Sequence, residues 1–538
     1  MKSECLSFPQ IPHTTRLFAD FLSDYPKVQQ FYPRTAHFNQ WLKEEAAAVR
    51  YGSDRRRAVA AILERQNRSW GASEKTQQNI DRLHNGALAA VTGQQVGLFG
   101  GPAFSIYKAL TAVKLAQTAA ENGIDCVPVF WLATTDHDLA EINHVFVPGP
   151  DAALQELAVS TQGVTDAPVG TIKFGGEIEA AVESAATFLG DSEILTALRE
   201  SYRPGETFGS AFARLFTKLF ADWGVILLDA SDPELHRVAE PIYRAAIERA
   251  AELDDALLAR GKELETAGYH QQVKVTPSST LLFTLHNGAR VPVHRRLNGT
   301  SMEFLIGEEN VSQEELLKRI STAPQDFSPN VLLRPIVQDH LLPTIAYTGG
   351  SAEVAYFAQG AVVYEKLLGR ITSVIPRFSA TLIEPKPRTL LDRYGLGLPD
   401  LFQGPGPLRE LLAARALPVE LQSAFDSATF SLEKSLAPIR TALEKLDKTL
   451  VDAADNAASK MQHQLESLRA RAARAELRQS EVLDRKAAFL SNTLYPNKVL
   501  QEREIGGIYF VSRYGADLLR TLYDSIHPDC LDHQVISL

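Results

Sequence analysis

The sequence predicts an α/β protein in which a parallel-sheet core with connecting inserts is followed by an α-helical coiled-coil domain. Apolar runs typical of buried strands alternate with helix-like segments between residues 87 and 376, which is the pattern of a parallel sheet. Leucine and isoleucine then recur at alternating steps of four and three between residues 432 and 450, which is the spacing of a heptad seam. Because a chain of 538 residues exceeds one compact core, we expect about three structural units.

Helices are expected over residues 1–85, because apolar side chains recur there every three to four positions. The chain then alternates between strand and helix. The expected elements are strand 87–92, helix 102–122, strand 126–134, helix 209–224, strand 225–230, strand 343–350, helix 351–369 and strand 371–376. The strands are apolar along their whole length, as strands of a parallel sheet covered on both faces usually are.

Two segments interrupt this alternation and read as inserts, near residues 145–205 and 269–310. The second contains Asn-Gly pairs at residues 287 and 298, and Asn-Gly is a preferred sequence for a tight hairpin turn. We therefore expect the inserts to be partly antiparallel.

The composition shifts from Glu384 onward, and the segment 384–407, rich in Pro and Gly, predicts a hinge. The heptad spacing predicts a coiled coil between about 418 and 490, and the point where its helix turns back stays open. The predicted domains are a core with the N-terminal helices and both inserts (1–385), a coiled-coil domain (386–495) and a C-terminal segment that returns to the core (496–538).

Bulk composition narrows the class of protein. The net charge is −10, which disfavours nucleic acid as a general partner. The sequence contains no apolar leader and no apolar run of about 18 residues, so we expect neither secretion nor a membrane partner. The three cysteines form no CxxC pair, so no zinc site is indicated, and a reducing, cytoplasmic setting is favoured.

The first motif is a glycine loop between the first core strand and its helix. Its glycines allow a tight turn, and the N–H groups at the start of a helix attract phosphate or carboxylate. The loop is neither a Walker A motif nor GxGxxG, and a turn without a ligand is the alternative. The candidate binding residues are Gly93, Gln94, Gln95, Gly97, Gly100, Gly101, Pro102, Tyr107 and Lys108.

The second motif is an ionisable cluster directly after the second core strand. Ligands of open α/β sheets bind at such strand ends. If the segment is helical, His137, Glu141 and His144 share one face, which could make a metal site or an acid–base and substrate-binding cluster. A solvated helix start is the third alternative. We expect catalytic groups rather than a bound metal at Asp136, His137, Asp138, Glu141 and His144, flanked by Thr135 and Asn143 in the same cleft.

Two further motifs can complete the cleft. A strand, two glycines and a helix start recur near residue 350, and an arginine with hydroxyl neighbours follows the last core strand as a possible phosphate clamp. Helix capping alone would also explain the first of these. The candidate residues are Tyr347, Gly349, Gly350, Glu353, Tyr356, Arg377 and Ser379.

A second anion or nucleotide site is expected where the coiled coil leaves and rejoins the core, because its two ends must meet there. Packing at the hinge is the alternative. The candidate residues are Glu384, Lys386, Arg388, Asn497, Gln501 and Arg503.

Five motifs occur in order between residues 92 and 503: TGQQVGLFGGPAFSIYK, TTDHDLAEINHV, TGGSAEVAYF, PRFSATLIEP and YPNKVLQER. Together they resemble the BshC family, the cysteine ligases of bacillithiol synthesis, over essentially the whole chain. The resemblance implies a Rossmann-like core of the class I aminoacyl-tRNA synthetase type, with a coiled coil that supports a homodimer. The glycine loop takes the place of the synthetase HIGH signature, and Arg377-Phe-Ser379 that of the KMSKS loop.

The resemblance also implies a reaction that joins L-cysteine to the amine of glucosaminyl-malate. Amide formation from a free carboxylate needs a better leaving group than hydroxide, so ATP with Mg²⁺ is the expected cofactor, and the adenylate and acyl-phosphate routes both stay open. The ionisable cluster could bind the cysteine ammonium, hold Mg²⁺ or deprotonate the attacking amine. The alternatives are another ATP-dependent amine–carboxylate ligase, a nucleotidyl transferase, a tRNA-binding synthetase-like module, or a structural dimer with vestigial loops.

Overall fold

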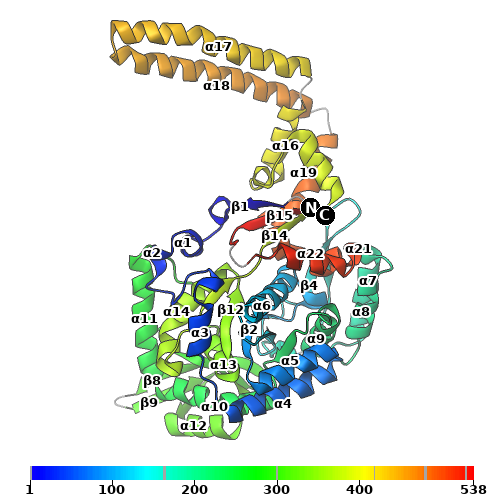
Figure 1. Cartoon of the computed structure of the whole chain (residues 1–538), viewed down its shortest axis with the longest axis vertical. Coiled ribbons are helices and arrows are strands. Elements are labelled where there is room, and N and C mark those ends of the chain that lie inside the picture. The colour runs from blue at the N-terminus through cyan, green and yellow to red at the C-terminus, as the bar shows by residue number, and fades with distance from the viewer. Residues whose placement is uncertain (1–2, 162–164, 299–300, 417–418, 478–480, 528–529) are drawn as a thin grey trace.

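The protein has a compact body from which a helical arm projects (Figure 1). The computed structural model describes residues 3–161, 165–298, 301–416, 419–477, 481–527 and 530–538. Among these residues, no helix is both long and apolar enough to cross a membrane.

A five-stranded parallel sheet forms the centre of the body, as predicted. Its strand order is β13-β12-β2-β3-β6. The strands are β2 (Leu88–Gln94), β3 (Cys126–Leu132), β6 (Ile226–Asp229), β12 (Thr344–Gly349) and β13 (Val374–Pro376). All five are almost wholly buried, because helices cover both faces of the sheet.

Side chains of alternate strand residues enter two different cores. Along β3, Val129 and Trp131 pack with α4 (Ser53–Ser69), α5 (Glu74–Asn85) and α14 (Ser351–Leu368). Phe130 and Leu132 pack instead with α6 (Phe104–Glu121) and α9 (Phe208–Leu219). The sheet is therefore the middle layer of a Rossmann-like, three-layer α/β fold.

The helices expected over residues 1–85 are confirmed, and they include α1 (Arg16–Ser23), α2 (Tyr25–Val28) and α3 (Leu42–Ala48) in addition to α4 and α5. An additional strand, β1 (Ser3–Leu6), precedes them. It pairs with β15 (His533–Ser537), which also pairs with β14 (Ala380–Ile383). This small sheet, which the sequence analysis did not predict, joins the first and last described segments beside the body (Figure 1).

Both inserts contain antiparallel structure, as predicted. The first has the hairpin β4 (His144–Pro148) and β5 (Leu154–Ala158), then α7 (Glu177–Leu189) and α8 (Glu193–Ser201). The second forms an antiparallel sheet of β7 (Ser279–His286), β8 (Ala289–Asn298), β9 (Ser301–Ile306), β10 (Glu309–Ser312) and β11 (Phe327–Pro329). Asn287 and Gly288 form the β7–β8 turn with φ values of 53° and 83°. The other predicted turn includes Gly299, which lies outside the described residues.

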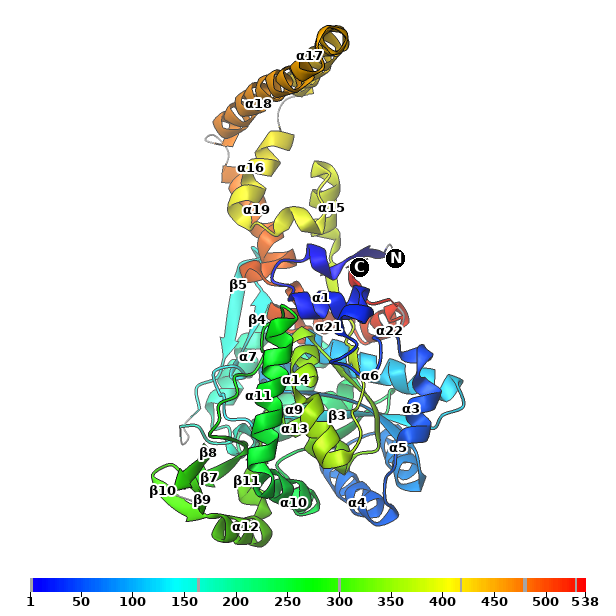
Figure 2. The same cartoon turned by 90° about the vertical axis from the view of Figure 1, so that its left-hand side faces the viewer.

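Four helices surround the second insert and connect it to the core. They are α10 (Pro233–Glu248), α11 (Ala250–Thr266), α12 (Gln313–Thr322) and α13 (Arg334–Leu341). Figure 2 shows this insert at the end of the body farthest from the arm, next to α10 and α12.

The arm is a hairpin of two long helices, α17 (Val419–Leu446) and α18 (Thr449–Leu477). The chain reverses at Asp447 and Lys448, where the Asp447 carboxylate accepts a hydrogen bond from the Thr449 N–H at 2.8 Å. The helices α15 (Pro385–Tyr394), α16 (Pro405–Arg415) and α19 (Glu481–Leu494) join the arm to the body. The segment predicted as a hinge is therefore largely helical, because its prolines sit in the first turns of α15, α16 and a short 3-10 helix (Leu398–Leu401), where a helix tolerates them.

After the arm, the chain returns to the body through α20 (Gln501–Glu504), α21 (Gly507–Tyr514) and α22 (Asp517–Ser525). The helix α21 packs on α6 and on the first insert's α7 and α8. Ahead of it, the Ile505 carbonyl accepts a hydrogen bond from the Ala103 N–H at 2.9 Å. The C-terminal segment thus covers the start of α6.

Candidate functional site

The candidate site lies where the order of the core sheet reverses. From β2 the chain adds β3 and β6 on one side, whereas β12 and β13 lie on the other. The carboxyl ends of β2 and β12 therefore flank the topological switch point, the usual ligand site of open α/β sheets. A cavity of about 640 Å³ opens there, and both strand ends line it together with Lys108, Glu353 and Arg377. Its volume is in the range of small-molecule sites.

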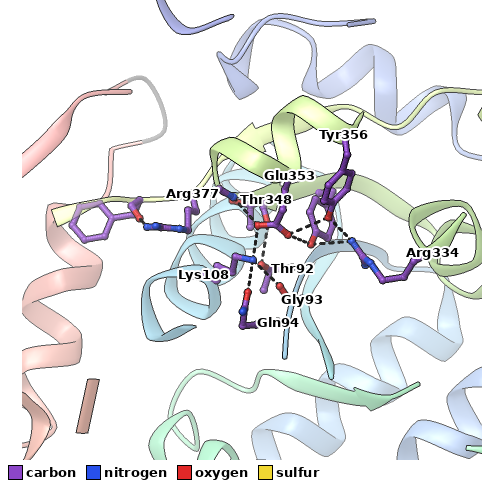
Figure 3. A network of polar contacts seen from close by, with 12 residues as sticks. Thr92, Gly93, Gln94, Lys108, Arg334, Thr348, Glu353, Tyr356 and Arg377 are labelled. Atoms are coloured by element: carbon purple, nitrogen blue, oxygen red, sulfur yellow. Dashed lines mark hydrogen bonds and ion pairs between the residues drawn. The ribbon is translucent and has the colours of Figure 1, made fainter. Parts of the chain in front are cut away.

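A buried ion pair bridges the two strand ends (Figure 3). The Lys108 ammonium lies 2.5 Å from the Glu353 carboxylate, and it donates to the Gly93 carbonyl at 2.8 Å and to the Gln94 side-chain oxygen at 2.9 Å. Burial lowers the pKa of Lys108 to about 8, although Glu353 opposes that shift. Burial would raise the pKa of Glu353, but Lys108, the Tyr347 hydroxyl and the Gly350 N–H hold it below its ordinary value.

A second cation extends this network toward α13. The Arg334 guanidinium donates to the Tyr356 hydroxyl at 2.8 Å and to the Tyr347 hydroxyl at 3.3 Å. The Tyr347 hydroxyl in turn donates to the Glu353 carboxylate at 2.5 Å. Figure 3 shows how these side chains join Arg334 to Lys108 along one wall of the cavity.

Arg377 lies at the boundary between this cavity and a smaller neighbouring one that also reaches the start of α14. Its guanidinium contacts the buried Glu502 carboxylate at 2.6 Å. Glu502 also accepts hydrogen bonds from the Ser379 hydroxyl and the Ala380 N–H, both at 2.9 Å. Burial lowers the pKa of His533, next to Ser379, to about 4, so this imidazole is neutral at pH 7.

The second insert contributes Arg290 to the opposite wall. Its guanidinium lies 3.9 Å from the centre of the Phe283 ring and donates to the Ser328 hydroxyl and the Pro329 carbonyl, both at 2.9 Å. A third bond of 2.9 Å joins it to Nδ1 of His137. Because a guanidinium can only donate, His137 accepts with Nδ1 and carries its proton on Nε2. Burial lowers the pKa of Arg290 to about 10.

The ionisable cluster is not helical, so the condition for a shared helical face is not met. Residues 133–143 are turns and loops, and His144 already begins β4, so His137, Glu141 and His144 share no helical face. Asp136 and Thr135 line the cavity. Gln95 donates to both Asp136 at 2.8 Å and Glu141 at 2.6 Å.

The other members of the cluster have local partners. Asp138 accepts a hydrogen bond from the Glu141 N–H at 3.2 Å, and the His144 ring contacts the Asn143 side-chain oxygen, also at 3.2 Å. Within the described ranges, no three His, Cys, Asp or Glu side chains gather as a metal site. The structure therefore brings only Asp136 of the five candidate catalytic residues to the cavity wall.

The glycine loop is divided between two environments. The cavity is lined by Gly93, Gln94, Gln95 and Lys108. The other residues of the glycine loop lie away from the cavity, where the C-terminal segment covers the start of α6. The Gly101 N–H donates to the Leu98 carbonyl, and the N–H that follows Pro102 donates to Ile505. These amides cannot bind an anion without losing those bonds. The residues placed away from the cavity are Gly97, Gly100, Gly101, Pro102 and Tyr107.

The remaining core candidates do meet. The large cavity is lined by Tyr347, Glu353, Tyr356 and Arg377. The smaller neighbouring cavity is lined by Gly349 and Ser379, and Gly350 lines both cavities. The helix start that lines the two cavities is therefore that of α14, in place of α6.

The six residues of the predicted junction site do not converge. Glu384 and Lys386 line a separate cavity of about 520 Å³, where Tyr509 and Tyr514 donate to the Glu384 carboxylate at 3.0 and 3.1 Å. The others have structural partners or lie elsewhere. Arg388 is hydrogen-bonded to Ser537, and Asn497 is hydrogen-bonded to Glu504. Gln501 is hydrogen-bonded to the backbone of Leu382. Arg503 lines the two cavities beside Arg377.

The large cavity is strongly cationic. Two carboxylates line it, Asp136 and Glu353, against six side chains that carry positive charge. The buried Glu502 carboxylate neutralises one more cation, Arg377, so an excess of three positive charges remains in a chain of net charge −10. The cationic residues are Lys108, Lys274, Arg290, Arg334, Arg377 and Arg503. Such a cavity attracts ligands that carry several carboxylate or phosphate groups. Five residues of the site were not predicted from the sequence. Lys274, Arg290, Arg334 and His533 lie in none of the five motifs, whereas Glu502 lies within YPNKVLQER but was not chosen as a candidate there.

The chain matches two family models. Residues 1–378 match "Bacillithiol biosynthesis BshC, N-terminal Rossmann-like domain", and residues 380–538 match "Bacillithiol biosynthesis BshC, C-terminal coiled-coil domain". A relative from Koribacter versatilis is 49% identical over 536 residues and one from Solibacter usitatus is 38% identical over 540, with all of both chains covered. A relative from Geobacillus thermodenitrificans is 29% identical, with 98% of each chain covered.

Each of these relatives carries the name "Putative cysteine ligase BshC". Since the two models together match almost the whole chain, and the identity to full-length relatives reaches 49%, the protein belongs to the BshC family of bacillithiol biosynthesis and is a ligase.

Proposed function

We propose that the protein joins L-cysteine to the amine of glucosaminyl-malate to form bacillithiol, with activation of the cysteine carboxylate by ATP. The observation that carries the proposal is the cationic cavity at the switch point of the sheet. Glucosaminyl-malate brings two malate carboxylates and ATP brings a triphosphate, so both substrates complement the charge of this cavity.

The two walls of the cavity suit two different anions. Arg377, Arg503 and the start of α14 lie together, and they can hold phosphate groups through bidentate hydrogen bonds and the helix dipole. Arg290 lies across the cavity on the second insert, and we assign it to a carboxylate of the amine substrate. Binding both substrates in one cavity brings the amine to the activated carbonyl, which is the main catalytic gain for a two-substrate reaction.

In the reaction, the cysteine carboxylate attacks the α-phosphorus of ATP and releases pyrophosphate to give an acyl-adenylate, or attacks the γ-phosphorus and releases ADP to give an acyl phosphate. The amine then attacks the carbonyl carbon, and AMP or phosphate leaves as the amide forms. The amine must lose a proton in this step. Asp136 is the proposed acceptor, because the Lys108 ammonium neutralises the other cavity carboxylate, that of Glu353.

Mg²⁺ fits the same donor set, since this ion binds through one or two carboxylates together with substrate phosphates. Asp136 would hold the ion during activation, where Mg²⁺ would neutralise phosphate charge, and the carboxylate would be free to accept the amine proton once the ion has left with the released phosphate product. We place the reaction in the cytoplasm, where free cysteine and ATP are available and where thiols are mostly kept reduced.

The decisive experiment is to incubate the purified protein with ATP, Mg²⁺, L-cysteine and glucosaminyl-malate and to detect products by mass. Bacillithiol with AMP supports the adenylate route, and bacillithiol with ADP supports the acyl-phosphate route. Arg377→Gln should lower the rate at least tenfold. A matched control is Arg57→Gln, because Arg57 is exposed and paired only with Asp54 on α4. Folded protein that forms no product and consumes no nucleotide would refute the proposal.

We also propose that two copies pair through their arms. Apolar side chains of the arm are left uncovered, since Ile439, Leu446 and Leu468 are 52%, 77% and 54% exposed. Exposed apolar side chains along a projecting arm are available for contact with a second arm. Sedimentation of the full chain should give twice the mass of one chain, and Leu446→Ser combined with Leu468→Ser should return it to the mass of one chain.

A further inference from the structure

Two of the three thiols lie side by side although they are 525 positions apart in the sequence. The Cys5 Sγ is 3.9 Å from the Cys530 Sγ. Cys5 lies on β1, and Cys530 lies shortly before β15. The strands β1 and β15 pair with each other, so the first and last described segments of the chain meet there (Figure 1). Cys5 is exposed and Cys530 is half-exposed, whereas the third thiol, Cys126, is buried in β3.

The local backbone holds the two thiols near one another without joining them. Pairing of Cys5 with Gln534 fixes the position of Cys5 along β15. The Cys530 N–H donates to the His527 carbonyl at 2.9 Å. A disulfide has an S–S length of about 2 Å, so the sulfur atoms must approach by about 2 Å. Side-chain rotation of the exposed Cys5 on its edge strand and of the half-exposed Cys530 can supply a movement of this size.

We propose that Cys5 and Cys530 form a site of reversible oxidation, at which a small-molecule disulfide converts the two thiols into an intramolecular disulfide. The thiolate of one cysteine attacks the small disulfide and releases one small thiol, which leaves a mixed disulfide on the protein. The second cysteine then displaces the other small thiol. Two protein thiols are oxidised, one small disulfide is reduced to two thiols, and the two protons leave with those thiols.

The rate of this exchange should increase with pH. Burial, together with the neighbouring Cys530, raises the pKa of the Cys5 thiol. The thiolate is the attacking species, so alkaline solution favours the first step. An exchange slowed in this way at neutral pH suits a response to sustained oxidation in an otherwise reducing compartment.

The disulfide would tie together two segments that lie on either side of Arg377. Residues Phe8 and Ile11, just after β1, line the small cavity that contains Arg377 and Arg503. Residues Ile526 and Asp532, on either side of Cys530, line another small cavity that contains Arg377 and Ser379. Oxidation would therefore restrain the surroundings of Arg377, the proposed phosphate-binding arginine. Formation of the Cys5–Cys530 disulfide does not depend on the proposed ligase reaction.

The test uses the full-length protein with glutathione disulfide as the probe, followed by intact-mass measurement and peptide mapping without reduction. We expect the loss of two hydrogen atoms, a linked pair of peptides containing Cys5 and Cys530, and a fall from three titratable thiols to one. Dithiothreitol should reverse all three changes. The melting temperature of the oxidised protein should be higher, because the cross-link closes a very long loop in the unfolded chain.

Matched variants separate this site from general thiol reactivity. Cys5→Ser and Cys530→Ser should each abolish the linked peptide and leave a stable glutathione adduct on the remaining thiol, whereas Cys126→Ala should still form the link. Separate glutathione adducts on both cysteines of the wild-type protein would overturn the proposal. So would a disulfide between two copies of the chain on a non-reducing gel.

Discussion

The buried pair of Lys108 and Glu353 gives the sharpest test of how the candidate site is held together. Glu353→Gln keeps the shape of the side chain but removes its charge. The Lys108 side chain is 4% exposed and that of Glu353 is 15% exposed, so solvent can compensate little for the lost carboxylate. Breaking a buried ion pair by removing one partner costs about 3–5 kcal/mol.

The lower part of that range is the better expectation for Glu353→Gln. Lys108 keeps two acceptors, the Gly93 carbonyl and the Gln94 side-chain oxygen, and glutamine can still accept from the Tyr347 hydroxyl. We therefore expect a loss of about 3 kcal/mol in the free energy of unfolding, equal to roughly a hundredfold change in the folding equilibrium.

Urea unfolding at pH 7 measures this loss of stability, and a double-mutant cycle shows whether the loss comes from the interaction between Lys108 and Glu353. Lys108→Met with Glu353→Gln leaves no unpaired charge, so the double variant should be at least about 2 kcal/mol more stable than the sum of the single losses predicts. Glu365→Gln, an exposed residue on the same helix, should change stability by no more than about 0.5 kcal/mol. A loss below about 1 kcal/mol for Glu353→Gln, or strict additivity in the cycle, would refute this reasoning.

Three further predictions concern the same cavity. Glu502→Gln should cost about 3 kcal/mol in urea unfolding, because it leaves the buried Arg377 guanidinium without its carboxylate; a cost near zero would show that Arg377 finds another partner. The folded pKa of Lys108, about 8, lies below its ordinary value of 10.5. The unfolded chain therefore binds more protons between these pH values, so the free energy of unfolding should rise by about 3 kcal/mol from pH 8 to 10.5. Lys108→Met should flatten that part of the pH series, and an unchanged slope would exclude Lys108 as its source. Arg290→Met should raise the KM for the amine substrate at least tenfold, whereas an unchanged KM would remove Arg290 from substrate binding.

Features set by neighbouring residues were predictable from the sequence. The core strands are apolar throughout, the Asn287-Gly288 turn adopts the positive φ values that this pair favours, and the heptad spacing identified the arm. Asp136 was found because it follows a buried strand of the sheet. Each of these signals lies within a few residues of the feature that it predicts.

Features that depend on distant parts of the chain could not be read in the same way. The start of α6 looked open to an anion, but Ile505, some four hundred positions later, accepts the hydrogen bond of its Ala103 N–H. The helical face proposed for His137 and His144 is absent because β4 begins at His144 and pairs with β5. Arg290 and Glu502 reach the site only through the second insert and the C-terminal segment.

The pairing of Ser3 with Ile536 also has a consequence during translation. At elongation rates of about 5–20 residues per second, β1 must wait on the order of half a minute to two minutes for its partner strand to be synthesised. Glu502, which holds Arg377, emerges from the ribosome almost as late. A nascent chain can therefore assemble its central sheet while its cavity still lacks a wall, and the enzyme becomes competent only when synthesis of this last segment is complete.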